Sequence, residues 1–201
     1  MRKTRPPEGD RMEKRNFKIK NISTRADGTS RIISGYFAVF NDLYQVWDGA
    51  YEAIAPGAFK DALKGDIRAL YNHNDDVILG RTSAYTLTLK EDHEGLYGEI
   101  IINESDAQAM NVYARVQRRD VTGASIGFVI EEEEQTTRPD GTALWTIIKI
   151  NPLIEVSICP FPASESTHIE ARGKQLEAMK RKVDSKRLME RKRQLREKLG
   201  R

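Results

Sequence analysis

Three side chains in this sequence have the chemical types that a serine-type acyl-transfer site needs. A hydroxyl nucleophile, an imidazole base and an orienting carboxylate make up such a site, and His73, Ser125 and Glu155 could supply them. They lie in three short segments, Leu70-Tyr71-Asn72-His73-Asn74-Asp75, Thr122-Gly123-Ala124-Ser125-Ile126-Gly127-Phe128 and Leu153-Ile154-Glu155-Val156-Ser157. The types therefore predict nucleophilic catalysis on an acyl group, provided that the fold brings the three together.

Ser125 is the candidate nucleophile because small residues surround it. Small neighbours let a substrate backbone come close and leave backbone amides to face a developing oxyanion. The segment matches the pattern Gly-x-Ser-x-Gly, but it begins a predicted strand and does not form a strand-to-helix elbow. The alternative is an ordinary serine at the start of a strand.

His73 is the candidate base among three histidines. His93 falls in a predicted turn and His168 lies beyond the predicted core, whereas His73 directly follows an apolar strand. An imidazole is the usual base for a serine hydroxyl because it titrates near neutral pH. The alternative is a structural or surface histidine.

Glu155 is the candidate third member because it interrupts an apolar strand. An unpaired buried carboxylate is costly, so Glu155 either pairs with the second ring nitrogen of His73 or points outward as a polar residue. Asp75, Asp76 and Asp92 are the other candidates for this role.

Several classes of site are excluded by what the sequence lacks. Cys159 is the single cysteine, so neither a disulfide framework nor a cysteine-rich zinc site is expected. The histidines lack metal-binding spacing, and no nucleotide-binding loop occurs, so we expect no metal and no cofactor. Because no apolar run approaches the roughly 20 residues of a membrane span and residues 1–15 do not resemble a secretory signal, we expect a cytoplasmic protein without membrane contact.

The elements that must position these residues are mostly strands. We expect seven or eight strands and two internal helices, with hairpin-like spacing and no regular βαβ alternation, which predicts a mostly β fold: a β-barrel or curled antiparallel sheet wrapped by α-helices. The predicted strands include residues 32–40, 67–71, 124–130, 145–150 and 153–158, with a turn at Asp27-Gly28 and a hairpin over 85–102. The predicted helices are residues 58–64 and a helix that Ser105 begins in a capping box and that ends at Arg119.

The charge distribution divides the chain into a domain and two extensions. We predict a disordered extension over residues 1–15, one domain over 16–165 and a basic helical tail over 166–201. Residues 172–201 hold 13 Lys or Arg and 4 Asp or Glu, a net charge of +9, which leaves a net charge of −6 on the rest. Such a tail suggests docking to an acidic surface, unless it is simply a solvated helix. It has no aromatic residues to stack on bases, so nucleic-acid binding is disfavoured.

Six segments, taken in order, resemble the prohead (capsid maturation) proteases of tailed bacteriophages. They are spread over about two thirds of the chain, between about residue 33 and residue 163. They are Ser34-Gly35-Tyr36-Phe37-Ala38-Val39-Phe40-Asn41, Ile54-Ala55-Pro56-Gly57-Ala58-Phe59, Leu70-Tyr71-Asn72-His73-Asn74, Ile78-Leu79-Gly80-Arg81-Thr82, Gly123-Ala124-Ser125-Ile126-Gly127-Phe128 and Glu155-Val156-Ser157-Ile158-Cys159-Pro160-Phe161-Pro162-Ala163.

The resemblance implies a serine peptidase with a fold like that of the herpesvirus assembly proteases. Ser125 would be its nucleophile, His73 its base and Glu155 its third member. The implied substrates are the scaffolding segment of the major capsid protein, cut inside the immature shell in the host cytoplasm, and the protease itself, which would lose its tail and could self-associate as a homo-oligomer. The rival interpretation is a non-enzymatic capsid assembly or scaffolding factor.

Overall fold

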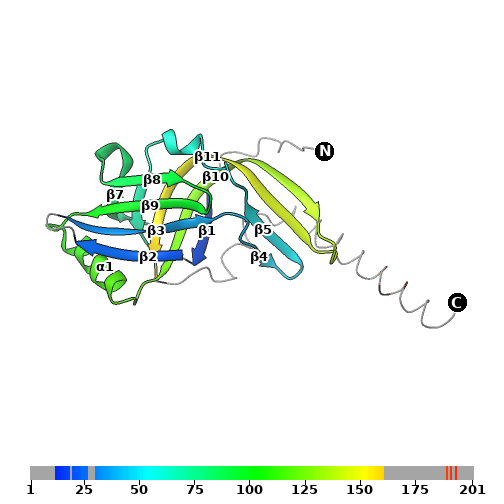
Figure 1. Ribbon diagram of the computed structural model, residues 1–201, viewed down its shortest axis with the longest axis horizontal. Coiled ribbons are helices and arrows are strands. Elements are labelled where there is room, and N and C mark those ends of the chain that lie inside the picture. The colour runs from blue at the N-terminus through cyan, green and yellow to red at the C-terminus, as the bar shows by residue number, and fades with distance from the viewer. Residues whose placement is uncertain are drawn as a thin grey trace.

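The computed structural model describes residues 12–18, 20–26 and 30–160, together with 189, 191 and 193. This part of the chain consists mainly of strands, with one α-helix and two short 3-10 helices (Figure 1). The strands are β1 (Glu13–Lys18), β2 (Lys20–Ala26), β3 (Arg31–Val39), β4 (Tyr44–Trp47), β5 (Ala50–Ile54), β6 (Arg68–Tyr71), β7 (Asn74–Arg81), β8 (Leu87–Glu91), β9 (Gly95–Ile102), β10 (Gly123–Thr137) and β11 (Ala143–Cys159). The helices are η1 (Ala62–Lys64), η2 (Thr82–Ala84) and α1 (Ala107–Gln117).

The strands form a seven-stranded and a four-stranded sheet. The larger sheet has the order β1-β10-β11-β5-β4, and β6 joins it by pairing with β11 and with β7. The smaller sheet, β2-β3-β9-β8, is antiparallel throughout. Because β11 is parallel to both β5 and β6, the larger sheet is mixed. The mostly β class predicted from the sequence is confirmed, with open sheets in the described part of the chain and no closed barrel.

The two sheets enclose one hydrophobic core, with the smaller sheet in front of β10 and β11 in Figure 1. Alternate residues of β10 and β11 are buried in this core, and residues of β3 and β9 face them from the other side. Because side chains alternate along a strand, the residues in between point to the opposite face of the larger sheet. We call that face the outer face. The core residues from these four strands include Ala124, Ile126, Phe128, Val156, Ile158, Ile33, Phe37, Leu96 and Ile100.

Several predicted elements are present. The strand predicted over residues 67–71 is β6, the strand over 32–40 is β3, and the hairpin over 85–102 is formed by β8 and β9. In the turn between β8 and β9, Asp92 Oδ1 accepts hydrogen bonds from the backbone amides of Glu94 (2.9 Å) and Gly95 (3.2 Å). The turn residues Asp27-Gly28 lie outside the described part, although β2 and β3 on either side of them pair antiparallel.

The helix predicted over residues 58–64 is wrong. Only Ala62–Lys64 is helical, as a single 3-10 turn. The residues before it form a turn and not a helix. In this turn the Glu91 carboxylate accepts hydrogen bonds from the backbone amides of Gly57 (2.7 Å) and Phe59 (3.0 Å). A seven-residue segment is too short to form a stable helix by itself, so a carboxylate from a distant strand decides its conformation.

The helix predicted from Ser105 to Arg119 exists, but its start is shifted by one residue. α1 spans Ala107–Gln117, and Asp106 is its N-cap residue. The Asp106 carboxylate accepts hydrogen bonds from the backbone amides of Gln108 (2.8 Å) and Ala109 (3.3 Å). Aspartate and serine are both good capping residues, so the sequence did not distinguish the two positions.

The last strands are longer than predicted. β10 continues through the acidic run 131–134, and β11 joins the two segments predicted at 145–150 and 153–158. Beyond residue 130, one edge of β10 pairs with no strand in the described part of the chain. Charged residues are well tolerated on such an edge strand. With β4 and β5, this part of the larger sheet extends away from the core (Figure 1).

The predicted extensions lie mostly outside the described residues. β1 begins at Glu13, just before the predicted domain boundary at residue 16, and Met189, Arg191 and Arg193 of the tail are helical. No helix within the described ranges is long and apolar enough to cross a membrane.

Candidate active site

His73 lies in the tight turn between β6 and β7. Tyr71 pairs with Asn74, so Asn72 and His73 form a two-residue loop. Their φ angles are 54° and 59°, as a type I′ hairpin turn requires. A non-glycine residue at positive φ is uncommon, and such conformations persist where the surrounding structure holds them. His73 therefore has a fixed and mildly unfavourable backbone conformation.

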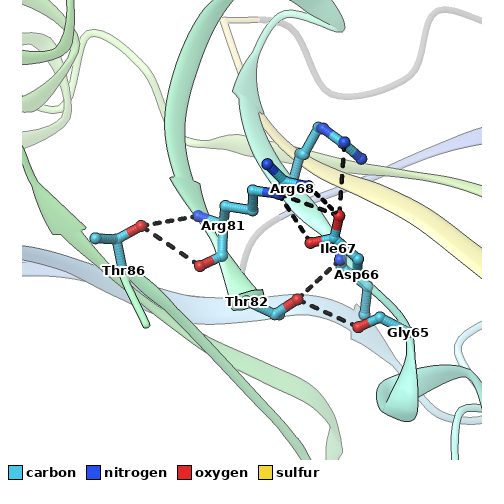
Figure 2. A network of polar contacts seen from close by, with 7 residues as sticks. All are labelled: Gly65, Asp66, Ile67, Arg68, Arg81, Thr82 and Thr86. Carbon is cyan, nitrogen blue, oxygen red and sulfur yellow. Dashed lines mark hydrogen bonds and ion pairs between the residues drawn. The ribbon is translucent and has the colours of Figure 1, made fainter. Parts of the chain in front are cut away.

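The opposite end of this hairpin is held by a polar network (Figure 2). Arg81 donates to both carboxylate oxygens of Asp66, from Nε at 2.9 Å and from a terminal nitrogen at 2.5 Å. The backbone amide of Ile67 donates to the Thr82 hydroxyl at 2.9 Å. Hydrogen bonds from Arg81 and then from Ser83 hold the pKa of Asp66 well below its usual range. The network joins the start of β6 to the end of β7.

Ser125 and Glu155 lie on neighbouring antiparallel strands. Ser125 of β10 is directly opposite Ser157 of β11, and Gly127 is directly opposite Glu155. Since Ala124, Ile126 and Val156 point into the core, Ser125, Glu155 and Ser157 lie on the outer face. They are nonetheless buried: Ser125 and Ser157 are 0% exposed and Glu155 is 4% exposed.

The structure brings His73 and Glu155 into direct contact. His73 Nδ1 lies 2.5 Å from Glu155 Oε1, and both side chains are largely buried. An ionised carboxylate only accepts hydrogen bonds, so a hydrogen bond to it requires the proton on Nδ1, and a neutral ring of this tautomer has its lone pair on Nε2. Glu155 thus points away from the core and is also paired, which combines the two possibilities drawn from the sequence.

The other acidic candidates have different surroundings. Asp75 and Asp76 are exposed at the start of β7, and Asp92 accepts a hydrogen bond from the Tyr36 hydroxyl at 2.9 Å. His93 is exposed in the turn between β8 and β9, and His168 lies outside the described residues. Of the acidic candidates, Glu155 is therefore the one that contacts His73, and Ser125 lies on the strand next to it.

Gly127 makes room for the Glu155 carboxylate. A Cβ atom at Gly127 would lie 2.6 Å from Glu155 Oε1 and 3.0 Å from its Cγ, which is too close for a real side chain. From the sequence, we expected the small residues around Ser125 to let a substrate backbone come close and to leave backbone amides facing an oxyanion. In the structure β1 and β11 flank this part of β10 on both sides, so its amides face other strands.

Ser157, which is not among the residues predicted for the site, connects the other groups. Its hydroxyl lies 2.6 Å from Glu155 Oε2, to which it donates, and it accepts a hydrogen bond from the backbone amide of His73 at 3.2 Å. Both carboxylate oxygens of Glu155 are therefore engaged. A signal for Ser157 was present, because it lies two residues after Glu155 on one strand and must share its face.

Cys159 lies further along the same face, but it is not a second nucleophile. Desolvation by burial and, after it, the negative charge of Glu155 raise the pKa of its thiol to about 12. The reactive form of a cysteine is the thiolate, so this thiol is inert near neutral pH. Within residues 30–160 and the described N-terminal strands, no three His, Cys, Asp or Glu side chains gather in a way that could hold a metal ion.

Comparison with known proteins shows to which family this chain is similar. The family described as caudovirus prohead serine protease matches residues 16–182. The prohead protease of Enterobacteria phage HK97 is 32% identical over 160 residues, which cover 78% of this chain and 66% of that protein. This chain thus spans just under two thirds of that relative. The solved structure of the bacteriophage T4 capsid assembly protease, gp21, aligns with 73% of this chain and 96% of its own, at a TM-score of 0.43 and 11% identity.

Proposed function

Because the chain belongs to the family of caudovirus prohead serine proteases, we propose that it hydrolyses peptide bonds with Ser125 as nucleophile, His73 as base and Glu155 as the third member. The observation that carries this proposal is the 2.5 Å contact between His73 and Glu155 beside the strand that bears Ser125. The family's serine chemistry requires a hydroxyl with such a pair.

In this mechanism His73 Nε2 removes the proton of Ser125 Oγ as the oxygen attacks the substrate carbonyl. Glu155 remains ionised, fixes the ring with Nδ1 protonated and stabilises the imidazolium that forms. The imidazolium then gives its proton to the leaving amine, and water hydrolyses the acyl-enzyme with His73 again as base. Since Ser125 is fully buried in this structure, a substrate must displace the atoms that cover it.

We further propose that the substrates are the scaffolding segment of the major capsid protein and the protease itself. The domain would then comprise residues 16–165, and self-cleavage would remove the basic segment 166–201. The enzyme would act inside the immature shell in the host cytoplasm, where its concentration is high enough for self-association. The family match supports a capsid substrate, and the charge contrast between body and tail supports a removable docking segment.

The test is co-expression of the chain with the major capsid protein of the same phage, followed by intact mass of both proteins. We expect the wild type to shorten the capsid protein and to lose its own residues beyond a site between about 160 and 175, while Ser125→Ala leaves both at full length. Equal cleavage by Ser125→Ala would assign the chemistry to another nucleophile. If neither chain cleaves anything, the non-enzymatic assembly role replaces the protease.

A further inference from the structure

We propose that Ser157 is a positioning residue of the active site, which holds His73 and Glu155 in register through one hydroxyl. This inference rests on the proposed function, because it assigns a role to a side chain within the same site. Ser157 is not a catalytic residue in this proposal, because it acts only through the two groups that it holds.

The first observation is how the hydroxyl uses its bonding capacity. A serine hydroxyl has one donor and two acceptor positions. Ser157 donates to Glu155 Oε2 at 2.6 Å and accepts from the backbone amide of His73 at 3.2 Å. One side chain on β11 is therefore bonded to the acid and to the base, which comes from a different hairpin.

The second observation is that these bonds control different degrees of freedom. Glu155 Oε1 bonds the ring of His73 and Oε2 bonds Ser157, so the carboxylate cannot rotate without breaking a bond. The amide of His73 bonds Ser157 while its φ is 59°, so the same hydroxyl helps to hold the strained turn. The ring and the backbone of His73 are thus bonded to two residues on the same face of one strand, Glu155 and Ser157.

The third observation is the location of Ser157. It is 0% exposed and directly opposite Ser125 across the β10–β11 ladder. Removal of its hydroxyl would leave one carboxylate oxygen of a buried glutamate without that donor. A displacement of about 1 Å at a reacting group can cost about 100-fold in rate, so the effect should appear in kcat.

The test compares the wild type with Ser157→Ala, and uses Ser34→Ala as the matched control. Ser34 is a buried strand serine of the other sheet, 6% exposed, with a hydroxyl 3.0 Å from that of Ser23. The first readout is the low-field proton NMR signal of a histidine Nδ1–H bonded to a carboxylate, identified by its loss in Glu155→Gln. We expect Ser157→Ala to shift or lose this signal, and Ser34→Ala to leave it unchanged. Absence of the signal from the wild type, or its persistence without a shift in Ser157→Ala, would overturn the proposal.

The second readout is cleavage of a synthetic peptide. Its sequence is that of the scaffolding segment cut from the capsid protein in the co-expression experiment. We expect Ser157→Ala to lower kcat by about 100-fold with KM within about twofold, and Ser157→Thr, which keeps the hydroxyl, to recover most of it. If Ser157→Ala does not fold, Ser157→Cys keeps the side-chain volume with a weaker donor and should give an intermediate NMR shift. A Ser125→Ala chain that cleaves like the wild type would contradict the proposed function, while the NMR result would still decide the role of Ser157.

Discussion

At the scale of single residues, the site depends on a missing side chain as much as on those present. The Glu155 carboxylate occupies the space that a Cβ atom at Gly127 would fill, since the two would be 2.6 Å apart. We predict that Gly127→Ala lowers kcat by about 100-fold, because the carboxylate must move away from His73. We also expect a loss of about 1 to 3 kcal/mol of unfolding free energy from overpacking. Peptide cleavage and urea unfolding measure the two effects.

Gly98→Ala is the control for this substitution. A Cβ atom at Gly98 would lie 2.6 Å from Phe37 and 2.7 Å from Leu89, so the clash is similar but lies in the smaller sheet. We expect a comparable loss of stability and nearly unchanged kcat below the melting temperature. If both variants lose activity to the same extent, general destabilisation and not the displaced carboxylate is the cause.

Cys159 gives a prediction about pH. Its thiol pKa is raised to about 12 in the folded protein, mainly by desolvation, whereas a thiol in the unfolded chain titrates near 8.5. As pH rises above that value, the unfolded state loses a proton that the folded state keeps, so stability falls. Between pH 8 and pH 10 we expect the wild type to lose about 2 kcal/mol more than Cys159→Ala does. Urea unfolding at both pH values measures this, and parallel losses would contradict it.

At the scale of elements, the β6–β7 hairpin carries the proposed base His73, and its turn has a conformational cost. Asn72 tolerates positive φ better than most residues, and its neighbour His73 is held at 59°. We predict that Asn72→Ala destabilises the fold by about 1 kcal/mol and lowers kcat as well, because the turn that carries His73 relaxes. Thermal unfolding and peptide cleavage check the two parts.

Asn41→Ala is the matched control for the hairpin. Asn41 is exposed in the turn after β3 and has a φ of 57°, so the substitution imposes the same kind of strain far from the predicted chemistry. We expect an equal loss of stability without a loss of kcat. A fall in kcat for Asn41→Ala as large as that for Asn72→Ala would show that the hairpin has no special role.

The same elements show what sequence alone could and could not predict. Short apolar or alternating segments predicted β3, β6, β8 and β9, and each of these strands has one face in the core. Local pattern failed for residues 58–64, where the distant Glu91 carboxylate fixes the turn, and for the acidic end of β10, which lies at an edge. Local pattern carries no information about such long-range partners.

The site shows the same limit. Residue types singled out His73, Ser125 and Glu155; the structure brings His73 and Glu155 into contact and places Ser125 on the strand beside Glu155, while their catalytic roles stay a prediction. The sequence could show that Ser157 shares a face with Glu155, but the contact of Ser157 with His73 depends on the pairing of β11 with β6, and the reason for Gly127 depends on the register of β10 with β11. Register follows from the assembled sheet and could not be derived from either strand alone.

At the scale of the whole molecule, charge separates the chain into two parts. Residues 172–201 carry a net charge of +9, and the rest of the chain carries −6. The site lies in the acidic part, on β6, β10 and β11. The basic tail attracts an acidic surface, and the acidic body attracts a basic one. This attraction is long-ranged at low ionic strength and is screened within about 10 Å at 0.1 M salt. We therefore expect the tail to affect where the chain binds and not the chemistry of the proposed site.

We predict that removal of residues 166–201 separates these two properties. In a Ser125→Ala background, which prevents cleavage, we expect the full chain to enter proheads of the same phage about tenfold more than the truncated chain does. The excess should disappear when assembly is carried out at about 500 mM salt, where charges are screened within a few ångströms. The catalytically intact truncated chain should keep the kcat of the full chain on the scaffolding peptide, because its strands and site are retained. Quantitative mass spectrometry of purified proheads measures the incorporation. Equal incorporation of both chains at low salt would mean that the acidic body, and not the tail, directs the enzyme to the shell.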